Sequence, residues 1–392
     1  MICSIKIRSY SILRISLIAL FFLPSSVLWA QSNPVPVSSD SVAKPLLHIL
    51  KKIQLSGTIR SRYTAALNHN VGIDGVEHSP GSASFSNNAF NIPQARLVVS
   101  GDVTSKMEVY FRANFADFSR NPQGRVLEYA YATYHFNHYL NVRMGVFRPY
   151  FGREDDIATD FLKSFDYSNQ YTAFDENGWM NYQMGVSLSG ELKCLAFPIR
   201  YYVGVYNGNR RNDFTDNDNG KQFPARVELD FTPDFQLGLN GGVGKENGEK
   251  ISVWGVDVYY KHRIGTRWEL DMVTEYKQGN NQSLFFSEAI PGVGVNEYQV
   301  RGAYILPSVL YKINSKEVKG LEASFKYEYL NPNYEQNGNT HNQFVPMLGI
   351  DFAEQNALRL QVGMLVDRYD HNIENSLFYN SSRFITQLQI RF

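Results

Sequence analysis

Beyond residue 52, apolar and polar residues alternate along the chain with a period of two. Within residues 53–64, for example, Leu55 and Ile59 alternate with Arg60 and Arg62. Successive side chains of a β-strand point to opposite faces, so each such segment has one apolar and one polar face. The pattern predicts sixteen strands, at residues 53–66, 90–101, 105–116, 125–136, 139–148, 180–192, 198–207, 223–231, 234–244, 250–263, 266–277, 297–311, 319–330, 343–352, 356–367 and 382–392.

The links between these strands alternate between short and long. Links after even-numbered strands are brief, such as those at residues 137–138, 232–233 and 264–265. Links after odd-numbered strands are longer, with residues 245–249 as the exception. Outer-membrane barrels show this asymmetry because short turns face the periplasm and long loops face outward, whereas a β-sandwich has no reason to sort its loops in this way. The expected fold is an all-β, transmembrane, antiparallel β-barrel over residues 53–392.

A barrel of this size predicts a water-filled pore. In hydrocarbon every backbone N–H and C=O must be paired, so only helices and closed barrels cross a bilayer. After residue 30 the chain has no continuous apolar run long enough for a membrane helix. An eight-stranded barrel is filled by its own side chains, whereas sixteen strands leave an aqueous channel. The sequence therefore predicts passive diffusion of small hydrophilic solutes and ions across a bacterial outer membrane.

The first 52 residues precede the alternating region. A basic start and an apolar stretch at residues 15–23 are followed by the small residue Ala30. This order is typical of a secretory signal peptide, here residues 1–30, and the apolar stretch is too short to span a bilayer. Residues 31–52 are expected to form a periplasmic tether. Because Cys194 is the one cysteine after the signal peptide, no internal disulfide is expected.

The charge balance excludes a nucleic-acid-binding or polybasic membrane-surface protein. The chain has 38 basic and 38 acidic residues, and loss of residues 1–30 removes three basic and no acidic ones, which leaves a net charge of −3. The chain also carries 25 Tyr, 26 Phe and 4 Trp although its mean hydropathy is −0.31. A membrane barrel accounts for both values, because its outer face is apolar with aromatic girdles while its lumen and loops are polar.

A wide pore needs an element that narrows it, and the long segment at residues 149–179 is the candidate. We expect it to fold into the lumen as a constriction loop after strand 5; the alternative is a loop that faces outward at the cell surface. With Arg148 at its root, the segment has three basic and seven acidic residues. They are Arg148, Arg153, Glu154, Asp155, Asp156, Asp160, Lys163, Asp166, Asp175 and Glu176.

The inward faces, as the alternation assigns them, are unevenly charged. Strands 1–7 form a basic wall with Arg60, Arg62, Arg96, Lys106, Arg112, Arg143 and Arg200 against Glu108 and Glu128. Strands 8–15 lean acidic, with Glu228, Asp230, Asp257, Glu269, Asp271, Glu275, Glu322, Glu328, Asp351 and Asp367 against Arg226, Lys261, Lys277, Arg301, Lys326 and Arg359. Charged walls bias the passage of ions, but salt bridges around the lumen are an equally valid interpretation. A register slip of one residue would exchange the two faces.

The last predicted strand ends on an aromatic residue. Phe384, Leu388, Ile390 and Phe392 share one face of this strand. We interpret the alternating segment with its terminal Phe392 as the feature that the bacterial barrel-assembly machinery recognises. An ordinary edge strand is the alternative interpretation.

Short motifs occur at residues 129–136 (YAYATYHF), 141–154 (NVRMGVFRPYFGRE), 205–209 (VYNGN), 216–221 (DNDNGK) and 225–227 (ARV). In these motifs the chain resembles the phosphate-selective porin O and P family. The likeness covers most of the chain after the signal peptide, although each motif is short. It implies a sixteen-stranded outer-membrane porin, usually a homotrimer, in which the loop after strand 5 constricts the pore.

The chain departs from the family pattern in two ways. Arg148 stands where a lysine is expected, which keeps the charge, and the expected constriction loop is net acidic. An anion-selective pore should present Arg and Lys at its narrowest part, so the resemblance does not carry phosphate selectivity to this chain. We therefore expect a general porin for small solutes, with a phosphate- or anion-selective porin as the alternative.

Two other classes of protein stay open, an outer-membrane hydrolase and a surface adhesin or receptor. A hydrolase needs a positioned nucleophile and base, and the chain has no G-x-S-x-G motif and no Ser and His pair that spacing singles out. We predict no catalytic residues, no cofactor and no bound metal. The expected partners are outer-membrane lipid or lipopolysaccharide, the assembly machinery, further copies of the chain, and small solutes or anions; no nucleic acid is expected.

Overall fold

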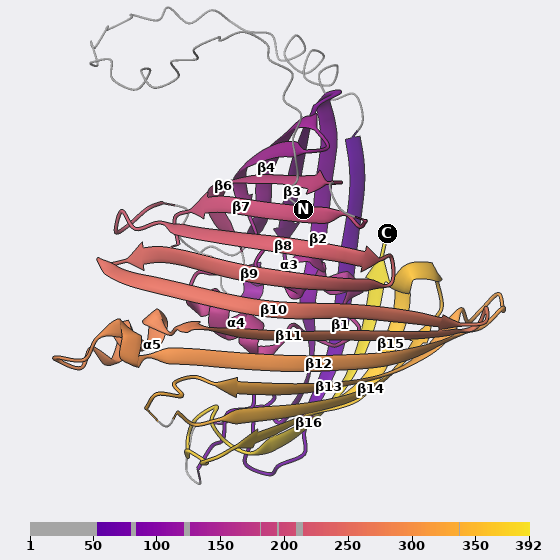
Figure 1. Ribbon diagram of the computed structural model, residues 1–392. Helices are drawn as coiled ribbons and strands as arrows, with labels where there is room; N and C mark the ends of the chain where they lie inside the picture. Colours follow the sequence, from indigo (N-terminus) through magenta and orange to yellow (C-terminus); the bar gives the residue numbers. More distant parts are fainter. Residues whose placement is uncertain are drawn as a thin grey trace, which may run out of the picture. The chain divides into compact units, whose positions relative to one another are not determined.

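Antiparallel strands pair in sequence order, and the first and last strands close them into a barrel (Figure 1). The computed structural model describes residues 53–79, 84–120, 126–180, 182–193, 196–208, 215–336 and 338–392. The expected signal peptide, residues 1–30, and tether, residues 31–52, lie outside the described residues. The strands are β1 Ile53–Ala66, β2 Asn88–Thr104, β3 Met107–Asn114, β4 Leu127–Asn137, β5 Leu140–Phe147, β6 Gln183–Leu192, β7 Ile199–Tyr206, β8 Gln222–Thr232, β9 Phe235–Glu246, β10 Glu249–Ile264, β11 Trp268–Asn280, β12 Gln299–Lys312, β13 Gly320–Asn331, β14 His341–Asp351, β15 Leu358–Tyr369 and β16 Ser381–Arg391.

The helices of the described residues are all short and lie in the connections. No described helix combines the length and the apolar character that crossing a bilayer requires. They are α2 Asp117–Arg120, α3 Arg153–Asp156, η1 Thr159–Phe161, α4 Asn169–Glu176, α5 Gln282–Glu288, η2 Val295–Glu297 and η3 Glu354–Asn356.

Each strand predicted from the alternation corresponds to an observed strand, and no boundary differs by more than three residues. Closure between β1 and β16 runs from Thr58 opposite Arg391 to Ala66 opposite Arg383. Beyond that ladder, the backbone N–H of Gly57 donates to the carbonyl of Phe392 at 2.8 Å. The barrel therefore has no unpaired edge strand, which a bilayer would not tolerate.

The two faces of the barrel wall differ as the alternation predicts. The outward side chains of Met144, Val243 and Leu348 are at least 60% exposed, whereas the inward Arg226 and Arg359 are each 1% exposed. The apolar outer face suits hydrocarbon, and the polar inner face can be hydrated or paired.

Arg301 does not line the lumen, which corrects the assignment made from the alternation. On β12 the even-numbered Val300 and Tyr304 are buried inside the barrel, so the odd-numbered residues face outward. The Arg301 guanidinium lies 4.7 Å from the ring centre of Tyr334. The sequence misled here because β12 carries apolar residues on both faces, for example Leu306, so its polarity alone does not show which face is inside.

The two ends of the barrel differ in the length of their connections. At one end, turns at residues 105–106, 138–139 and 233–234 contain two residues each. The other end carries the longer connections, of which residues 148–182 form the longest, and residues 247–248 are the short exception. By the asymmetry of outer-membrane barrels, the long-loop end is extracellular and the other end is periplasmic.

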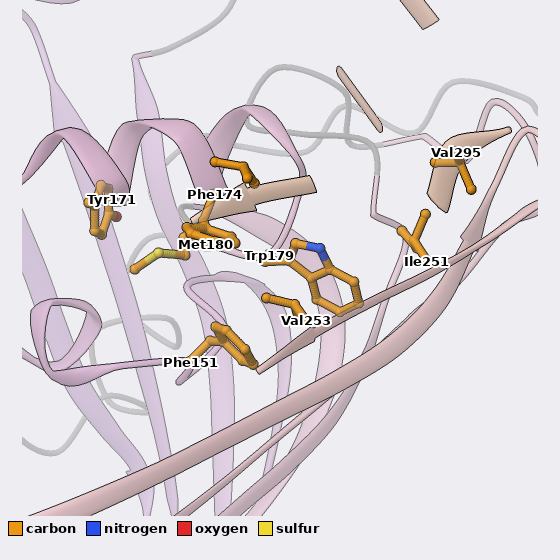
Figure 2. Close-up of a cluster of buried hydrophobic side chains, with 9 residues drawn as sticks. Phe151, Tyr171, Phe174, Trp179, Met180, Ile251, Val253 and Val295 are labelled. Atoms are coloured by element: carbon orange, nitrogen blue, oxygen red, sulfur yellow. The ribbon is translucent and has the colours of Figure 1, made fainter. Parts of the chain in front are cut away.

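An apolar cluster anchors the connection after β5 inside the barrel (Figure 2). Phe151, Phe174 and Trp179 of this connection are fully buried in a cluster that includes Ile251 and Val253 of β10. Full burial of a large apolar side chain contributes roughly 1.5–3 kcal/mol. Hydrophobic contact therefore holds this loop against the wall in addition to its polar contacts.

We predict that Gly145→Ala destabilises the barrel by about 2 kcal/mol. Gly145 on β5 has a φ of 133°, and a Cβ there would overlap the carbonyl oxygen of Ala130 and press on the Cα of Tyr131. The effect is measured as the urea concentration at which half of the protein in detergent has lost its folded, heat-modifiable gel band. Gly241→Ala on β9 is the matched control because a Cβ there meets nothing within 4 Å. Equal midpoints for the two variants would contradict the prediction.

Candidate functional site

The connection at residues 148–182 lies inside the barrel. Figure 1 shows its helices α3 and α4 behind strands β8–β11. Lys163 Nζ lies 3.3 Å from the carboxylate of Glu322 on β13, and the Asp160 carboxylate lies 3.4 Å from the guanidinium of Arg391 on β16. The segment is therefore in the lumen and not at the outer surface. The other predicted residues of this loop lie on or beside its first short helix, with Arg148 at the root and Arg153, Glu154, Asp155 and Asp156 on α3.

Two acidic residues of the loop are used for its own folding. The Glu154 carboxylate accepts hydrogen bonds from the backbone N–H and the hydroxyl of Ser168, at 3.0 and 2.5 Å. The Asp155 carboxylate accepts one from the backbone N–H of Phe151 at 3.2 Å. Both carboxyl groups are buried, so the acidic composition of the loop does not place them in the water of the pore.

Burial also changes the charge of these loop carboxyls. Burial and, to a smaller extent, the nearby Glu275 raise the pKa of Glu154 to about 8. Burial likewise raises the pKa of Asp155 to about 7. Although burial opposes it, the guanidinium of Arg62 lowers the pKa of Asp166 to about 2. At neutral pH the loop therefore carries less negative charge than its composition indicates.

The basic residues of the loop contact neutral groups and wall carboxylates. Arg148 is buried, and its guanidinium donates to the hydroxyls of Tyr167 and Tyr182 at 2.6 and 2.9 Å. Arg153 donates to the side-chain oxygen of Gln236 on β9 at 2.7 Å. The loop is thus fastened to the wall by its cations as well as by its apolar cluster.

All six arginines predicted for the basic wall face the lumen, but they differ in their partners. Arg96 and Arg112 share the carboxylate of Glu128, each at 2.7 Å. Arg200 lies 2.9 Å from the Asp230 carboxylate and is therefore balanced by an acid. The six are Arg60, Arg62, Arg96, Arg112, Arg143 and Arg200.

Among the arginines of the basic wall and the root of the loop, Arg60, Arg143 and Arg148 have no carboxylate within 4.0 Å in the described part of the chain. Arg60 donates to the side-chain oxygen of Gln389 at 2.8 Å. Arg143 donates to the Tyr150 hydroxyl at 3.3 Å. Their hydrogen-bond partners are neutral, so no carboxylate in direct contact compensates the charge of these three groups.

The opposite wall carries many carboxylates, and basic partners hold them. On this wall the charged side chains form salt bridges with one another, which was one of the two interpretations of the charged lumen. The pairs on or against β7–β16 are Glu228 with Arg200, Asp257 with Arg226, Glu269 with Lys261, Asp271 and Glu322 with Lys163, Glu275 with Lys277, Glu328 with Lys326, Asp351 with Arg359, and Asp367 with Arg383.

A set of tyrosines around the arginines was not predicted as part of the site. The Arg112 guanidinium lies 4.1 Å from the ring centre of Tyr129, and that of Arg143 lies 4.3 Å from the ring centre of Tyr131. A register shift in β4 places both Glu128 and Tyr129 toward the lumen. The sequence signal was present in the Tyr-Ala-Tyr-Ala alternation of this strand, but the bulge that decides its inner face was not visible in it.

On one side of the lumen, arginine N–H groups donate to tyrosine hydroxyls and to other neutral oxygens. Guanidinium N–H groups that reach the water of the lumen can replace part of the hydration shell of an anion. The stacked rings stabilise the guanidinium groups without neutralising them. The arrangement can therefore pass small hydrated solutes and discriminate between them by charge.

A closed barrel with a charged lumen and an inward loop defines an outer-membrane porin. Residues 66–309 match the family described as phosphate-selective porin O and P. The chain belongs to this family, and it forms a channel in the bacterial outer membrane. No curated protein matches the chain in sequence.

Solved structures of other outer-membrane proteins share the fold. The outer membrane channel DcaP of Acinetobacter baumannii is 12% identical over 87% of this chain and 97% of that chain, with a TM-score of 0.55. An anion-selective porin from Comamonas acidovorans is 9% identical over 87% and 98%, with a TM-score of 0.55. The trimer form of OmpT from Vibrio cholerae is 10% identical over 87% and 99%, with a TM-score of 0.53. At these identities the likeness shows the fold alone.

We predict that the stability of the protein falls more steeply with rising pH than that of Glu154→Gln. The pKa of Glu154 is raised from 4.5 to about 8 on folding, so the unfolded chain loses this proton first. Between these two pKa values the folded protein holds a proton that the unfolded chain has already released. The free energy of unfolding therefore declines by up to about 1.4 kcal/mol per pH unit. Glutamine keeps the acceptor for Ser168 and removes the titration.

Urea midpoints of both proteins between pH 4 and pH 9 measure this difference. The wild-type protein should lose stability relative to the variant across the window from about 4.5 to about 8, and the difference should level off above it. Parallel curves over the whole range would show that Glu154 titrates normally in the folded protein.

Proposed function

We propose that the porin conducts anions in preference to cations. The observation that carries this proposal is the imbalance of paired and unpaired charge across the lumen. Arg60, Arg143 and Arg148 keep positive charge without a carboxylate partner among the described residues, whereas the facing carboxylates are held by basic groups. Uncompensated fixed charge raises the local concentration of the opposite ion.

The extracellular side of the constriction offers a matching approach for an anion. A cavity of about 260 Å³ lies there, and its lining includes Arg62, Lys326 and Arg383 together with Asp166. Asp166 is engaged by Arg62 at 2.8 Å. Beyond this cavity, the half-buried Arg143 on the same wall can bind an anion weakly. Weak binding at several sites allows passage, because binding has to be reversible for conduction.

Phosphate is the anion that the family description points to. We propose phosphate as one permeant anion and keep a general porin for small solutes as the second candidate. The supporting observation for a general porin is the size of the barrel and its many neutral polar groups, since these accept solutes of either charge. One of the similar solved structures, the porin from Comamonas acidovorans, is described as anion-selective, and this supports the proposal of anion preference.

We predict that Arg143→Gln lowers the permeability ratio of chloride to potassium by roughly threefold to fivefold. One fixed charge near the pathway is worth about 1 kcal/mol at the dielectric of a wet pore. Reversal potentials of single channels in a potassium chloride gradient give the ratio. Arg301→Gln is the matched control, because it removes the same charge from the outer face of the barrel.

Two outcomes would decide between the candidate functions. An anion preference that decreases in Arg143→Gln but not in Arg301→Gln supports the proposal, and block of chloride current by millimolar phosphate would add phosphate as a bound anion. A wild-type channel without ion preference would favour the general porin. A folded barrel that shows no conductance would contradict both.

We also propose that the chain forms a homotrimer. The family resemblance and the trimer form of the OmpT neighbour support this assembly, as does the broad apolar outer face, which either lipid or another protomer can cover. Native mass spectrometry of the protein in detergent tests it, and a monomer at all concentrations would contradict it. We propose outer-membrane lipid and lipopolysaccharide as the surroundings of the remaining outer face.

The barrel-assembly machinery is a further proposed partner, and it would recognise the last strand through its terminal aromatic residue. We predict that Phe392→Ala reduces the amount of protein assembled in the outer membrane about tenfold, a loss of about 1.4 kcal/mol of recognition. The Phe392 side chain is 64% exposed, and its backbone bonds to Gly57 do not depend on the ring. Phe384→Ala, on the same outward face, is the control.

Quantitative blotting of folded protein in outer-membrane fractions measures assembly. Refolding of both variants in detergent should remain equal to that of the wild type, which separates recognition from stability. Equal assembly of Phe392→Ala and Phe384→Ala would show that the terminal ring has no special role.

A further inference from the structure

The β9–β10 hairpin sorts its charges between the two faces of the barrel. Its tip reads Lys245-Glu246-Asn247-Gly248-Glu249-Lys250, and the turn residues Asn247 and Gly248 have φ values of 47° and 90°. Such a two-residue turn fixes the register tightly. Lys245 stands opposite Lys250, and Glu246 stands opposite Glu249. By the alternation of β9, the lysines share the outward face with Val243, and the glutamates share the inward face.

The two lysines form a like-charged pair without a compensating acid. Lysines directly opposite each other on neighbouring strands repel and destabilise the ladder. Both side chains are exposed, and neither ammonium group lies within 4.0 Å of a carboxylate among the residues that the structure describes. Lys221 beside them is paired with Asp216. The Lys245 and Lys250 pair therefore presents positive charge that is not paired with any described carboxylate.

The position of this pair corresponds to the headgroup level of the outer leaflet. The hairpin lies at the long-loop, extracellular end of the barrel. On β10 the outward Trp254, which is 50% exposed, lies four residues below Lys250. Outward tryptophans mark the edge of the hydrocarbon. Four residues of strand span about 13 Å, the strand tilt reduces this to about 10 Å of height, and lysine side chains can reach back toward the membrane.

A groove joins the lysines to the lipid-facing surface. It has a volume of about 570 Å³, and its lining includes Lys245, Lys250, Phe223 and Val243. Phe223 and Val243 are 48% and 61% exposed on the outward face. Cationic groups at the upper end and apolar side chains at the lower end match a molecule with an anionic headgroup and acyl chains.

A third cation lies on the same rim. Arg301 on β12 is in register with Gln278, which is in register with Trp254, so Arg301 lies two strands from Trp254 near the same end of the barrel. Its guanidinium is stacked on Tyr334 at 4.7 Å and has no carboxylate within 4.0 Å in the described part of the chain. This outward arginine has no place in the ion pathway.

We propose that Lys245 and Lys250, with Arg301 two strands away, bind the phosphorylated headgroup of an anionic glycolipid of the outer leaflet, of the lipid A type. The ammonium groups would contact a phosphate, and the acyl chains would lie on Phe223, Val243 and Trp254. A phosphate between the two lysines would remove their mutual repulsion and fix the hairpin. The site rests on the outer-membrane location of the barrel and is independent of the ion preference of the pore.

The test is the binding of bisphosphorylated lipid A to the full-length porin in detergent, measured by native mass spectrometry. The double variant Lys245→Gln with Lys250→Gln should bind about 25-fold more weakly than the wild type, since each lysine near an anionic headgroup contributes about fivefold. Lys316→Gln is the matched control, because Lys316 is an exposed lysine in the turn at residues 313–319 of the opposite end. Its affinity should equal that of the wild type.

Further arms identify the source of the phosphate. Lipid A without phosphate groups should bind the wild type as weakly as bisphosphorylated lipid A binds the double variant. Inorganic phosphate at about 10 mM, well below physiological ionic strength, should not displace the lipid. Displacement by inorganic phosphate would overturn the proposal in favour of a site for a free anion.

Two results would contradict the lipid site directly. Equal affinity of the double variant and the wild type for lipid A would remove the lysines from the site. Loss of the oligomer in the double variant with unchanged lipid affinity would assign this surface to a second copy of the chain. Heat-modifiable migration and unchanged conductance in high salt show that the variants are folded, so a loss of binding is a loss of the site.

Discussion

Backbone hydrogen bonding in a medium without water is the constraint on which this structure depends. Each strand edge must be satisfied by another strand, and the ladder between β1 and β16 satisfies the last two edges. Closure brings segments more than 300 residues apart into contact, as the reciprocal bonds of Gly57 and Phe392 show. It also forces the polar faces of all strands toward one interior, so the contents of the lumen follow from the closure of the barrel.

Charges gathered in one interior have to be hydrated or paired, because burying an isolated charge is costly. Most charged side chains in the lumen are paired with an opposite charge, such as Arg226 with the buried Asp257. Near β2–β6 the partners are tyrosine rings and hydroxyls, as for Arg143 and Arg148. The difference between the two solutions is functional, since ion pairs cancel a field and neutral aromatic partners keep it. The preference of the pore for anions is our proposal from this difference.

The inward loop depends on the wall, and the charge of the wall depends on the loop. Lys163 of the loop lies between Asp271 and Glu322 of the wall and balances both. Asp166 of the loop forms an ion pair with Arg62 of the wall. A net charge counted along the loop therefore says little about the charge that an ion meets. The apolar cluster around Trp179 adds a contribution that involves no charged group, and it holds the loop against the wall (Figure 2).

The sequence by itself determined the strands, their number, their two faces and the difference between the two ends. These properties depend on local alternation and on the length of connections, which can be counted along the chain. The tertiary structure decided which charges are free. Arg148 and Arg200 look alike in the sequence, yet one contacts tyrosines and the other Asp230. The outward position of Arg301 and the bulge at Glu128 were decided there as well, because partners and faces are set by strands that meet only when the barrel closes.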